Sequence, residues 1–400
     1  MDVVHDRARI MVEEDRISNL PNEIIHHILS FLDMKYAVQT SALSKKWKHI
    51  WTSMKHLNLN SLTSRTSPLF AKFVNDALSH RNHRKEVSAV ELSFRGAATQ
   101  FAAVVTRIVN YAYSHNVRQL TLVWFRLNYE VLQFPQWLFS SHTLKHLTLA
   151  THYTSGYGII VPQSAWNFPA LETLNLSDLT LSDPRYKSLN LFSKCVNLKD
   201  LILHRCSMSG SGMDIFNVCA PQLSNLTITN PLRFPKVFNV VAPQLQNLTV
   251  SVLDTFYRVM QLSIEKLNSL EKVNLSMQLV FSEEGRYAPG LQDLFQKLCG
   301  AKFLILDNNI IKVLSACLDQ LSYQPCPFNN LKCLKQKDRI PIMPIKVRNY
   351  LLQNSPTATF VMDLPQVPRK RSREEVDKGT MAKKVSKFLY AFYPFEYIYV

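Results

Sequence analysis

A six-residue leucine pattern recurs along most of this 400-residue chain and constrains its fold more than any other feature. The pattern reads Leu-x-x-Leu-x-Leu, with Val, Ile or Met allowed at the apolar positions. If the second apolar position of each copy is its marker, the markers fall at 57, 90, 120, 147, 174, 201, 226, 248, 273, 304 and 334. Units of this size cannot bury an apolar face alone, so we expect neighbouring copies to stack and share one core.

Each copy has the apolar pattern of a strand, and several of the intervals between copies have the apolar pattern of a helix. The last two apolar residues of a copy alternate with a polar one, which is the period of a strand with one buried face. Apolar residues at helical spacing lie between copies, in 70–78, 101–109, 291–298 and 313–321. We therefore predict stacked strand-plus-helix units with one continuous core.

Over roughly residues 54–360, this pattern resembles the leucine-rich repeat family. The resemblance implies an α/β solenoid with a parallel sheet on its concave face and helices or irregular turns on its convex face. The copies are unevenly spaced, and the Asn that usually follows the strand in this family is mostly missing. We therefore expect irregular repeats rather than a uniform horseshoe.

A short helical head precedes the repeats. Residues 18–23 have the composition of a helix start, and two further short helices are indicated at 37–42 and 47–51. A head of this size has a small core, so part of its apolar surface should stay exposed and available for contact with another protein or domain. Six side chains of the first helix share one apolar arc: Ile24, Ile25, Ile28, Leu29, Phe31 and Leu32.

The head resembles a plant-type F-box along the whole motif. Leu20-Pro21, the run 28–32, Thr40-Ser41, 43–45 and Trp47 fall where that family has them. The resemblance implies docking on the Skp-type adaptor of a cullin-RING ubiquitin ligase, with the repeats holding the substrate and no catalysis by this chain. The implied adaptor-contacting residues are Leu20, Pro21, Ile24, Ile28, Leu29, Leu32, Val38 and Leu43, whereas Trp47 and Trp51 are assigned to the inner core.

The far end is similar to the FBD-type segment that closes many plant F-box repeat proteins. Residues 328–334 and 345–362 would supply a last strand, a helix and another strand that cap the core. The expected organisation is a flexible start at 1–14, an F-box at 15–56 and repeats at 57–327. A capping segment at 328–363 and a basic tail at 364–400 that ends in an aromatic stretch would follow.

Outward positions on the concave strands are the candidate target-binding surface. A receptor of this kind acts by proximity, because it raises the effective concentration of a target near the conjugating enzyme. The positions predicted to face outward on three central strands are Lys145, His146, Thr148, Glu172, Thr173, Asn175, Lys199, Asp200 and Ile202.

The net charge of +16 is concentrated near the end of the chain, where 332–387 holds 14 basic and 5 acidic residues. Two basic clusters there resemble the signals read by nuclear import receptors, although a solvated basic tail is equally compatible. We expect a nuclear or cytoplasmic protein. The alternative function is a basic nuclear scaffold or nucleic-acid-associated repeat protein, but nucleic-acid binding is not favoured. The candidate import residues are Arg369, Lys370, Arg371, Arg373, Lys383 and Lys384.

Several function classes lack support in the sequence. Only 9 glycines occur, and no glycine-rich nucleotide loop is present. The seven cysteines form no Cys-x-x-Cys pair and read as reduced core thiols of an intracellular protein. The pairs His80/His83 and His142/His146 lack further metal ligands at a familiar interval. No run of 18 apolar residues occurs. We therefore expect no cofactor, no metal and no membrane partner; the target protein cannot be named from the sequence.

Overall fold

A computed structural model describes residues 19–126, 134–152, 159–160, 166–181, 188–208, 215–231, 235, 237–253, 261–264, 267, 269–278, 288–323, 325–337 and 341–362. The predicted flexible start, the basic tail with its import signal and the aromatic stretch lie outside these residues.

The head forms the three short helical stretches that the sequence predicts. They are α1 (Asn22–Ser30), α2 (Met34–Gln39) with a 3-10 turn η1 (Thr40–Ala42), and the 3-10 helix η2 (Trp47–Ser53). Asp33 caps α2, because its side chain accepts a hydrogen bond from the Lys35 amide at 2.8 Å. Trp47 is buried and Trp51 packs partly buried against the core.

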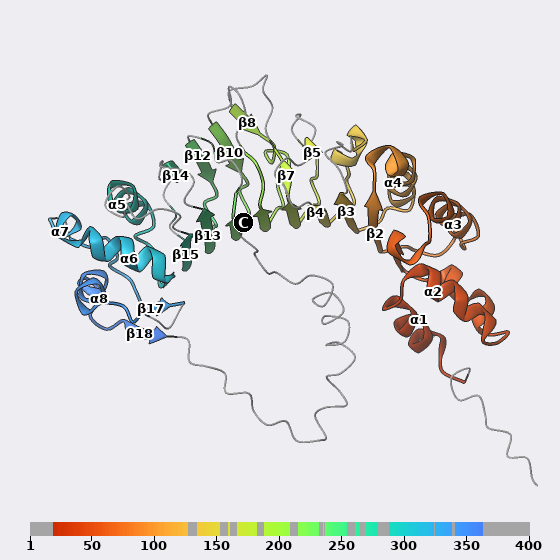
Figure 1. The fold of residues 1–400 in the computed structure, drawn as a ribbon, viewed down its shortest axis with the longest axis horizontal. Coiled ribbons are helices and arrows are strands. Elements are labelled where there is room, and N and C mark those ends of the chain that lie inside the picture. The colour runs from red at the N-terminus through yellow and green to blue at the C-terminus, as the bar shows by residue number, and fades with distance from the viewer. Residues whose placement is uncertain are drawn as a thin grey trace, which may run out of the picture.

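A twelve-stranded parallel sheet runs through the whole described body and lines the concave side of a curved molecule (Figure 1). The α/β solenoid with irregular leucine-rich repeats is therefore confirmed. Its strands, in spatial order, are β1 (His56–Asn60), β2 (Ala89–Gly96), β3 (Gln119–Arg126), β4 (His146–His152), β6 (Thr173–Ser177), β9 (Asp200–His204), β11 (Asn225–Thr229), β13 (Asn247–Leu253), β15 (Lys272–Gln278), β16 (Phe303–Leu306), β17 (Cys333–Gln336) and β18 (Thr359–Met362).

The strand register follows the leucine markers. Leu57 pairs with Val90, and the same row continues through every marker as far as Leu334, with Phe360 added by β18. A one-residue slip would turn every leucine out of the core, so the apolar pattern fixes this register.

Helices cover the convex side at both ends of the arc, and strands cover its middle (Figure 1). The longest intervals between markers, of 30 to 33 residues, provide the length that a helix needs. They hold α3 (Ser67–Ser79) after the 3-10 turn η3 (Ser61–Thr63), α4 (Ala98–Ser114), α5 (Ala288–Lys297), and α6 (Asn308–Ala316) with α7 (Leu318–Leu321).

Among the described residues, the outer segments of the shorter middle repeats are mainly extended. A second parallel sheet contains β8 (Ser188–Asn190), β10 (Ile215–Cys219), β12 (Val237–Val241) and β14 (Gln261–Ile264). The short pair β5 (Ile159–Ile160) and β7 (Leu179–Thr180) and the 3-10 turn η4 (Gln136–Phe139) complete the outer layer. Aromatic rings of neighbouring repeats contact one another between the layers, and those of Phe216 and Phe238 stack with centroids 5.6 Å apart.

The capping segment has the predicted strand, helix and strand: β17, α8 (Ile345–Leu352) and β18. Gln336 is completely buried at the end of β17 and organises the connection to α8. Its amide nitrogen donates to the Pro341 carbonyl at 2.7 Å, and its oxygen accepts from the Met343 amide at 2.9 Å. This buried amide is therefore fully paired inside the protein.

Candidate adaptor-binding and target-binding surfaces

The apolar arc of α1 divides into an inward strip and an outward strip. Ile25 and Leu29 have no exposed surface, whereas Ile24 is 46%, Ile28 40% and Phe31 68% exposed. Ile25 and Leu29 are four positions apart, as are Ile24 and Ile28, so each pair lies on one face of the helix. The two faces are offset by one residue. Hydrophobic periodicity alone marks both strips as apolar; the packing of the head decides which one is covered.

The inward strip packs against η2 and β1, and a polar contact fixes the same face. Nε2 of His26 lies 2.9 Å from Oγ of Ser53 and 3.2 Å from the Ile50 carbonyl. The assignment of Leu29 to the adaptor-contacting set is therefore wrong, because its side chain is sealed inside the head.

The other predicted adaptor residues differ in accessibility. Pro21 is exposed at the start of α1, and Leu43 is 65% exposed after η1. Leu20, Leu32 and Val38 are half-buried and pack against the core, so each offers only part of its side chain. The sequence analysis left Phe31 out of the adaptor set, although its position three residues after Ile28 places it on the outward strip.

Together, Pro21, Ile24, Ile28, Phe31 and Leu43 are called the head strip below. Adaptor binding by these residues stays a prediction. Large exposed apolar side chains on one small head mark a surface that a partner can cover.

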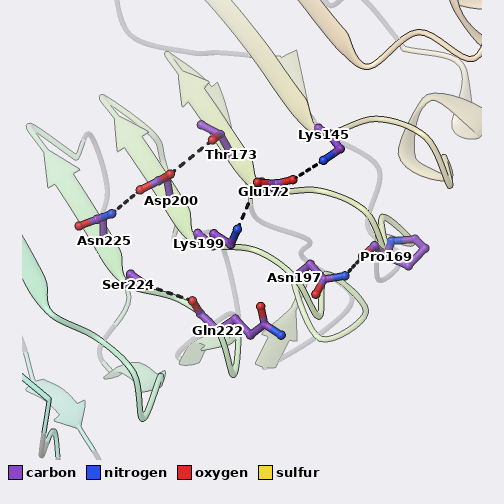
Figure 2. A network of polar contacts seen from close by, with 10 residues as sticks. All are labelled: Lys145, Pro169, Glu172, Thr173, Asn197, Lys199, Asp200, Gln222, Ser224 and Asn225. Atoms are coloured by element: carbon purple, nitrogen blue, oxygen red, sulfur yellow. Dashed lines mark hydrogen bonds and ion pairs between the residues drawn. The ribbon is translucent and has the colours of Figure 1, made fainter.

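The candidate target-binding residues lie on three adjacent strands, β4, β6 and β9, except for Lys145, Glu172 and Lys199, which immediately precede them. At the amino edge of these strands the Nζ atom of Lys145 lies 2.7 Å from one Glu172 oxygen, and that of Lys199 lies 3.2 Å from the other (Figure 2). The hydrogen bonds from Lys145 and Lys199 hold the pKa of Glu172 below its ordinary value. This edge is therefore a row of solvent-accessible charges that alternate in sign, with Glu172 half-buried between two exposed lysines.

A second polar row lies one residue further along the strands. Thr173 donates to Asp200 at 3.4 Å, Asn225 donates to the other Asp200 oxygen, and Asn247 donates to Asn225 at 2.6 Å (Figure 2 shows the first three residues). These bonds connect neighbouring strands and hold the side chains in one orientation. The row presents pre-ordered amide and carboxylate groups to the concave side.

The remaining predicted positions complete the same face. His146 is exposed at the start of β4, and Thr148, Asn175 and Ile202 stand in register on β4, β6 and β9. Their common face is thus confirmed by the strand register, while the binding of a target there stays a prediction.

An ion pair at the carboxyl end of these strands was missed in the sequence analysis. Nε of Arg205 lies 2.7 Å from Oδ1 of Asp178, whose side chain is nearly buried. Burial raises the pKa of Asp178, against the opposite effect of Arg205. Both residues, like Asn230 of the next repeat, have left-handed backbone angles, with φ between 48° and 57°. The three residues occupy equivalent bends after successive strands. Because the residue type differs at each bend, the sequence does not reveal this shared backbone conformation.

The described residues hold neither a candidate membrane span nor a candidate metal site. No helix among them is long and apolar enough to cross a membrane. Nor does this part of the chain bring together three or more His, Cys, Asp or Glu residues in a way that could hold a metal ion.

None of the seven cysteines forms a disulfide bond, and four of them are buried. Cys195, Cys206, Cys317 and Cys326 lie in the core, but Cys299 is exposed. The prediction of core thiols is therefore wrong for Cys299, which lies two residues after the end of α5.

Comparison with known proteins identifies both parts of the molecule. The F-box domain family matches residues 17–59, and the leucine-rich repeats of FBD-associated F-box protein At5g56370 match residues 105–271. F-box/LRR-repeat protein 25 of Arabidopsis thaliana is 32% identical over 202 residues, which cover 50% of this chain and 72% of the relative. The chain belongs to the F-box/LRR-repeat family.

The similarity to a second relative covers most of this chain. The putative F-box/FBD/LRR-repeat protein At4g03220 of Arabidopsis thaliana is 26% identical over 384 residues, or 88% of this chain and 74% of the relative. The F-box match ends within the last residues of β1, so this first strand belongs to both the head and the repeats.

Proposed function

We propose that this protein is the non-catalytic substrate receptor of an SCF-type cullin-RING ubiquitin ligase. Its F-box would bind a Skp-type adaptor, and its repeats would bind a protein target for ubiquitination. The observation that carries the proposal is the head strip, because an F-box fold leaves these apolar side chains uncovered while Ile25 and Leu29 anchor the same helix from inside.

The packed junction between head and repeats supports this role. α1 and α2 pack against β1, the first strand of the sheet. In addition, Nζ of Lys35 in α2 donates a hydrogen bond to the Thr63 carbonyl beyond β1. A target held on the concave strands would therefore keep a defined position relative to the adaptor, as a proximity mechanism requires.

The concave face supports binding of a protein target. Its central strands carry alternating charges and oriented amide groups in parallel rows, which offer many directional contacts over an extended surface. We propose localisation in the nucleus, the cytoplasm or both, and the basic clusters at 369–373 and 383–384 support the nuclear part of this proposal.

The test is capture of a purified Skp-type adaptor by the full-length protein. The double variant Ile28→Ala with Phe31→Ala removes two exposed side chains of the head strip and should weaken capture by at least about tenfold. The matched control is Leu62→Ala with Leu69→Ala, which removes two exposed leucines after β1 and in α3. Failure of the unmodified protein to capture the adaptor, or equal capture by both double variants, would contradict the proposed function.

A further inference from the structure

The two ends of the large sheet are covered differently (Figure 1). At one end α1 and α2 of the head pack against β1, whose marker Leu57 is only 1% exposed. At the other end β18 is the last strand, and it pairs with β17. Within the described part of the chain no strand lies on the opposite side of β18, which is called its outer edge below. The backbone groups of such an edge can pair with a further strand.

The side chains of β18 are incompletely buried. Each marker from Leu57 to Leu334 is at most 1% exposed, because strands or the head cover it on both sides. Phe360 continues this row but is only half-buried, as is Met362. On the opposite face of the strand, Val361 is 43% exposed. The described residues therefore leave the end of the core partly open, although stacked repeats need a cap at each end.

The chain that follows β18 contains one more copy of the repeat pattern. It reads Val385-x-x-Phe388-x-Tyr390, with aromatic residues at two of its apolar positions. Its marker, Phe388, comes 28 positions after Phe360, and successive markers of the repeats are 22 to 33 positions apart. The spacing thus predicts that Phe388 takes the next place in the row.

A second copy with Tyr393 as its marker also falls in this interval, 33 positions after Phe360. The ladder of the sheet argues against it. The Thr359 amide, one residue before its marker, donates to the Lys332 carbonyl of the preceding strand at 2.9 Å. In a parallel ladder every second amide points the same way, so the residue after a marker must also donate. For Tyr393 that residue is Pro394, which has no N–H.

The connection is long enough for a parallel strand. Two parallel neighbours need a crossover of a dozen or more residues. Residues 337–358 join β17 to β18 and contain α8. Residues 363–386 are two positions longer and can return the chain to the same edge of the sheet.

We propose that residues 387–391 of this chain bind along the outer edge of β18 as a thirteenth parallel strand. Phe388 pairs with Phe360 and closes the end of the core. Leu389 lies beside Val361 and covers its exposed side chain. The amide of Leu389 donates to the Phe360 carbonyl, in the pattern of the other strands. This strand closes the edge against a second copy of the protein and is independent of adaptor binding.

Disulfide trapping in the full-length protein tests the register. Neighbouring parallel strands lie about 4.8 Å apart, a separation that a disulfide can bridge. With Cys299→Ser and Cys333→Ser as background, Val361→Cys with Leu389→Cys should cross-link within one chain under mild oxidation. The matched control, Val361→Cys with Ile398→Cys, should cross-link at least about tenfold more slowly. Peptide mass spectrometry of mixed isotope-labelled and unlabelled protein distinguishes bonds within one chain from bonds between chains.

Equal rates for the two cysteine pairs would overturn the proposal. Cross-links formed only between chains would also overturn it and would identify a second copy as the occupant of the edge.

Hydrogen exchange provides a second measurement without new cysteines. The amides of 387–391 should exchange at least about tenfold more slowly in the parent protein than in Phe388→Asp, because a carboxylate cannot take a place in the apolar row. Phe395→Asp makes the same change beyond the proposed strand and should preserve the slow exchange. Rapid exchange at 387–391 in the parent protein, or equal loss of protection in both variants, would contradict the proposed strand, whatever the result of adaptor capture.

Discussion

Arg81 donates a hydrogen bond from Nε to the hydroxyl group of Tyr111 at 3.1 Å, and both side chains are buried. The other guanidinium nitrogens donate to the carbonyls of Trp51, at 3.4 Å, and Met54. One side chain thus joins the last helix of the head to α4 of the repeats. Burial lowers the pKa of Arg81, an effect that the contact with Tyr111 partly offsets.

Arg81→Ala should lower the free energy of unfolding by about 3 kcal/mol, because it removes the arginine donor from the Met54 carbonyl and the Tyr111 hydroxyl group in the interior, and one of the two donors from the Trp51 carbonyl. Tyr111→Phe removes only one hydrogen bond and should cost about 1 kcal/mol. Urea denaturation of the full chain measures both changes. Arg107→Ala, on the exposed side of α4, is the control and should cost less than about 0.5 kcal/mol. Equal effects at positions 81 and 107 would contradict the bridging role of Arg81.

The inward strip of α1 should contribute much more to the unfolding free energy than the outward strip. Leu29→Ala empties a fully buried site and should cost about 2–5 kcal/mol of unfolding free energy. Ile28→Ala truncates a side chain that is 40% exposed and should cost less than about 1 kcal/mol. Thermal or urea unfolding gives the comparison. A larger loss of stability at position 28 would show that the head packs through the opposite face of this helix.

Asp33 should make the head less stable as pH rises. Burial raises the pKa of this carboxyl group from 3.8 to about 6, although the Lys35 amide acts in the opposite direction. The folded state therefore binds the proton more tightly than the unfolded state, so the unfolding free energy falls between about pH 4 and pH 6. Above pH 6 the ionised carboxylate should cost on the order of 2 kcal/mol.

Asp33→Asn preserves a good helix cap and cannot ionise. The variant should be more stable than the parent protein above pH 6 and should lose that part of the pH dependence. Unfolding measured at several pH values between 4 and 8 tests both expectations. Parallel stability curves for the two proteins would mean that Asp33 does not titrate in this range.

Cysteine labelling should be confined largely to Cys299. Burial raises the pKa of both Cys195 and Cys206 to about 12, and their thiols are inaccessible in the folded protein. Short treatment with iodoacetamide at pH 7.5, followed by peptide mass spectrometry, should find Cys299 modified first. Cys299→Ser should remove most of the rapid labelling. Rapid modification of Cys206 under native conditions would show that the solenoid opens easily.

Much of the repeat architecture was determined by the sequence itself. The spacing of Leu57, Leu147 and Leu201 was enough to predict their strands, because an alternating apolar pattern buries one face in only one register. The F-box residues and the capping segment were recognisable because their local helix and strand signals agree with their packing. The ion pair of Asp178 and Arg205 carries no such signal, since it joins bends of adjacent repeats.

Only the tertiary structure decided which apolar face of α1 is covered and which distant residues meet. Ile28 and Leu29 are adjacent and equally apolar, yet η2 and β1 cover one and leave the other exposed. Arg65 and Arg95 are 30 residues apart and share a cavity because β1 and β2 are neighbours in the sheet. A periodic pattern specifies which residues can be buried, but exposure and charge pairing depend on segments distant in sequence that meet only when the chain folds.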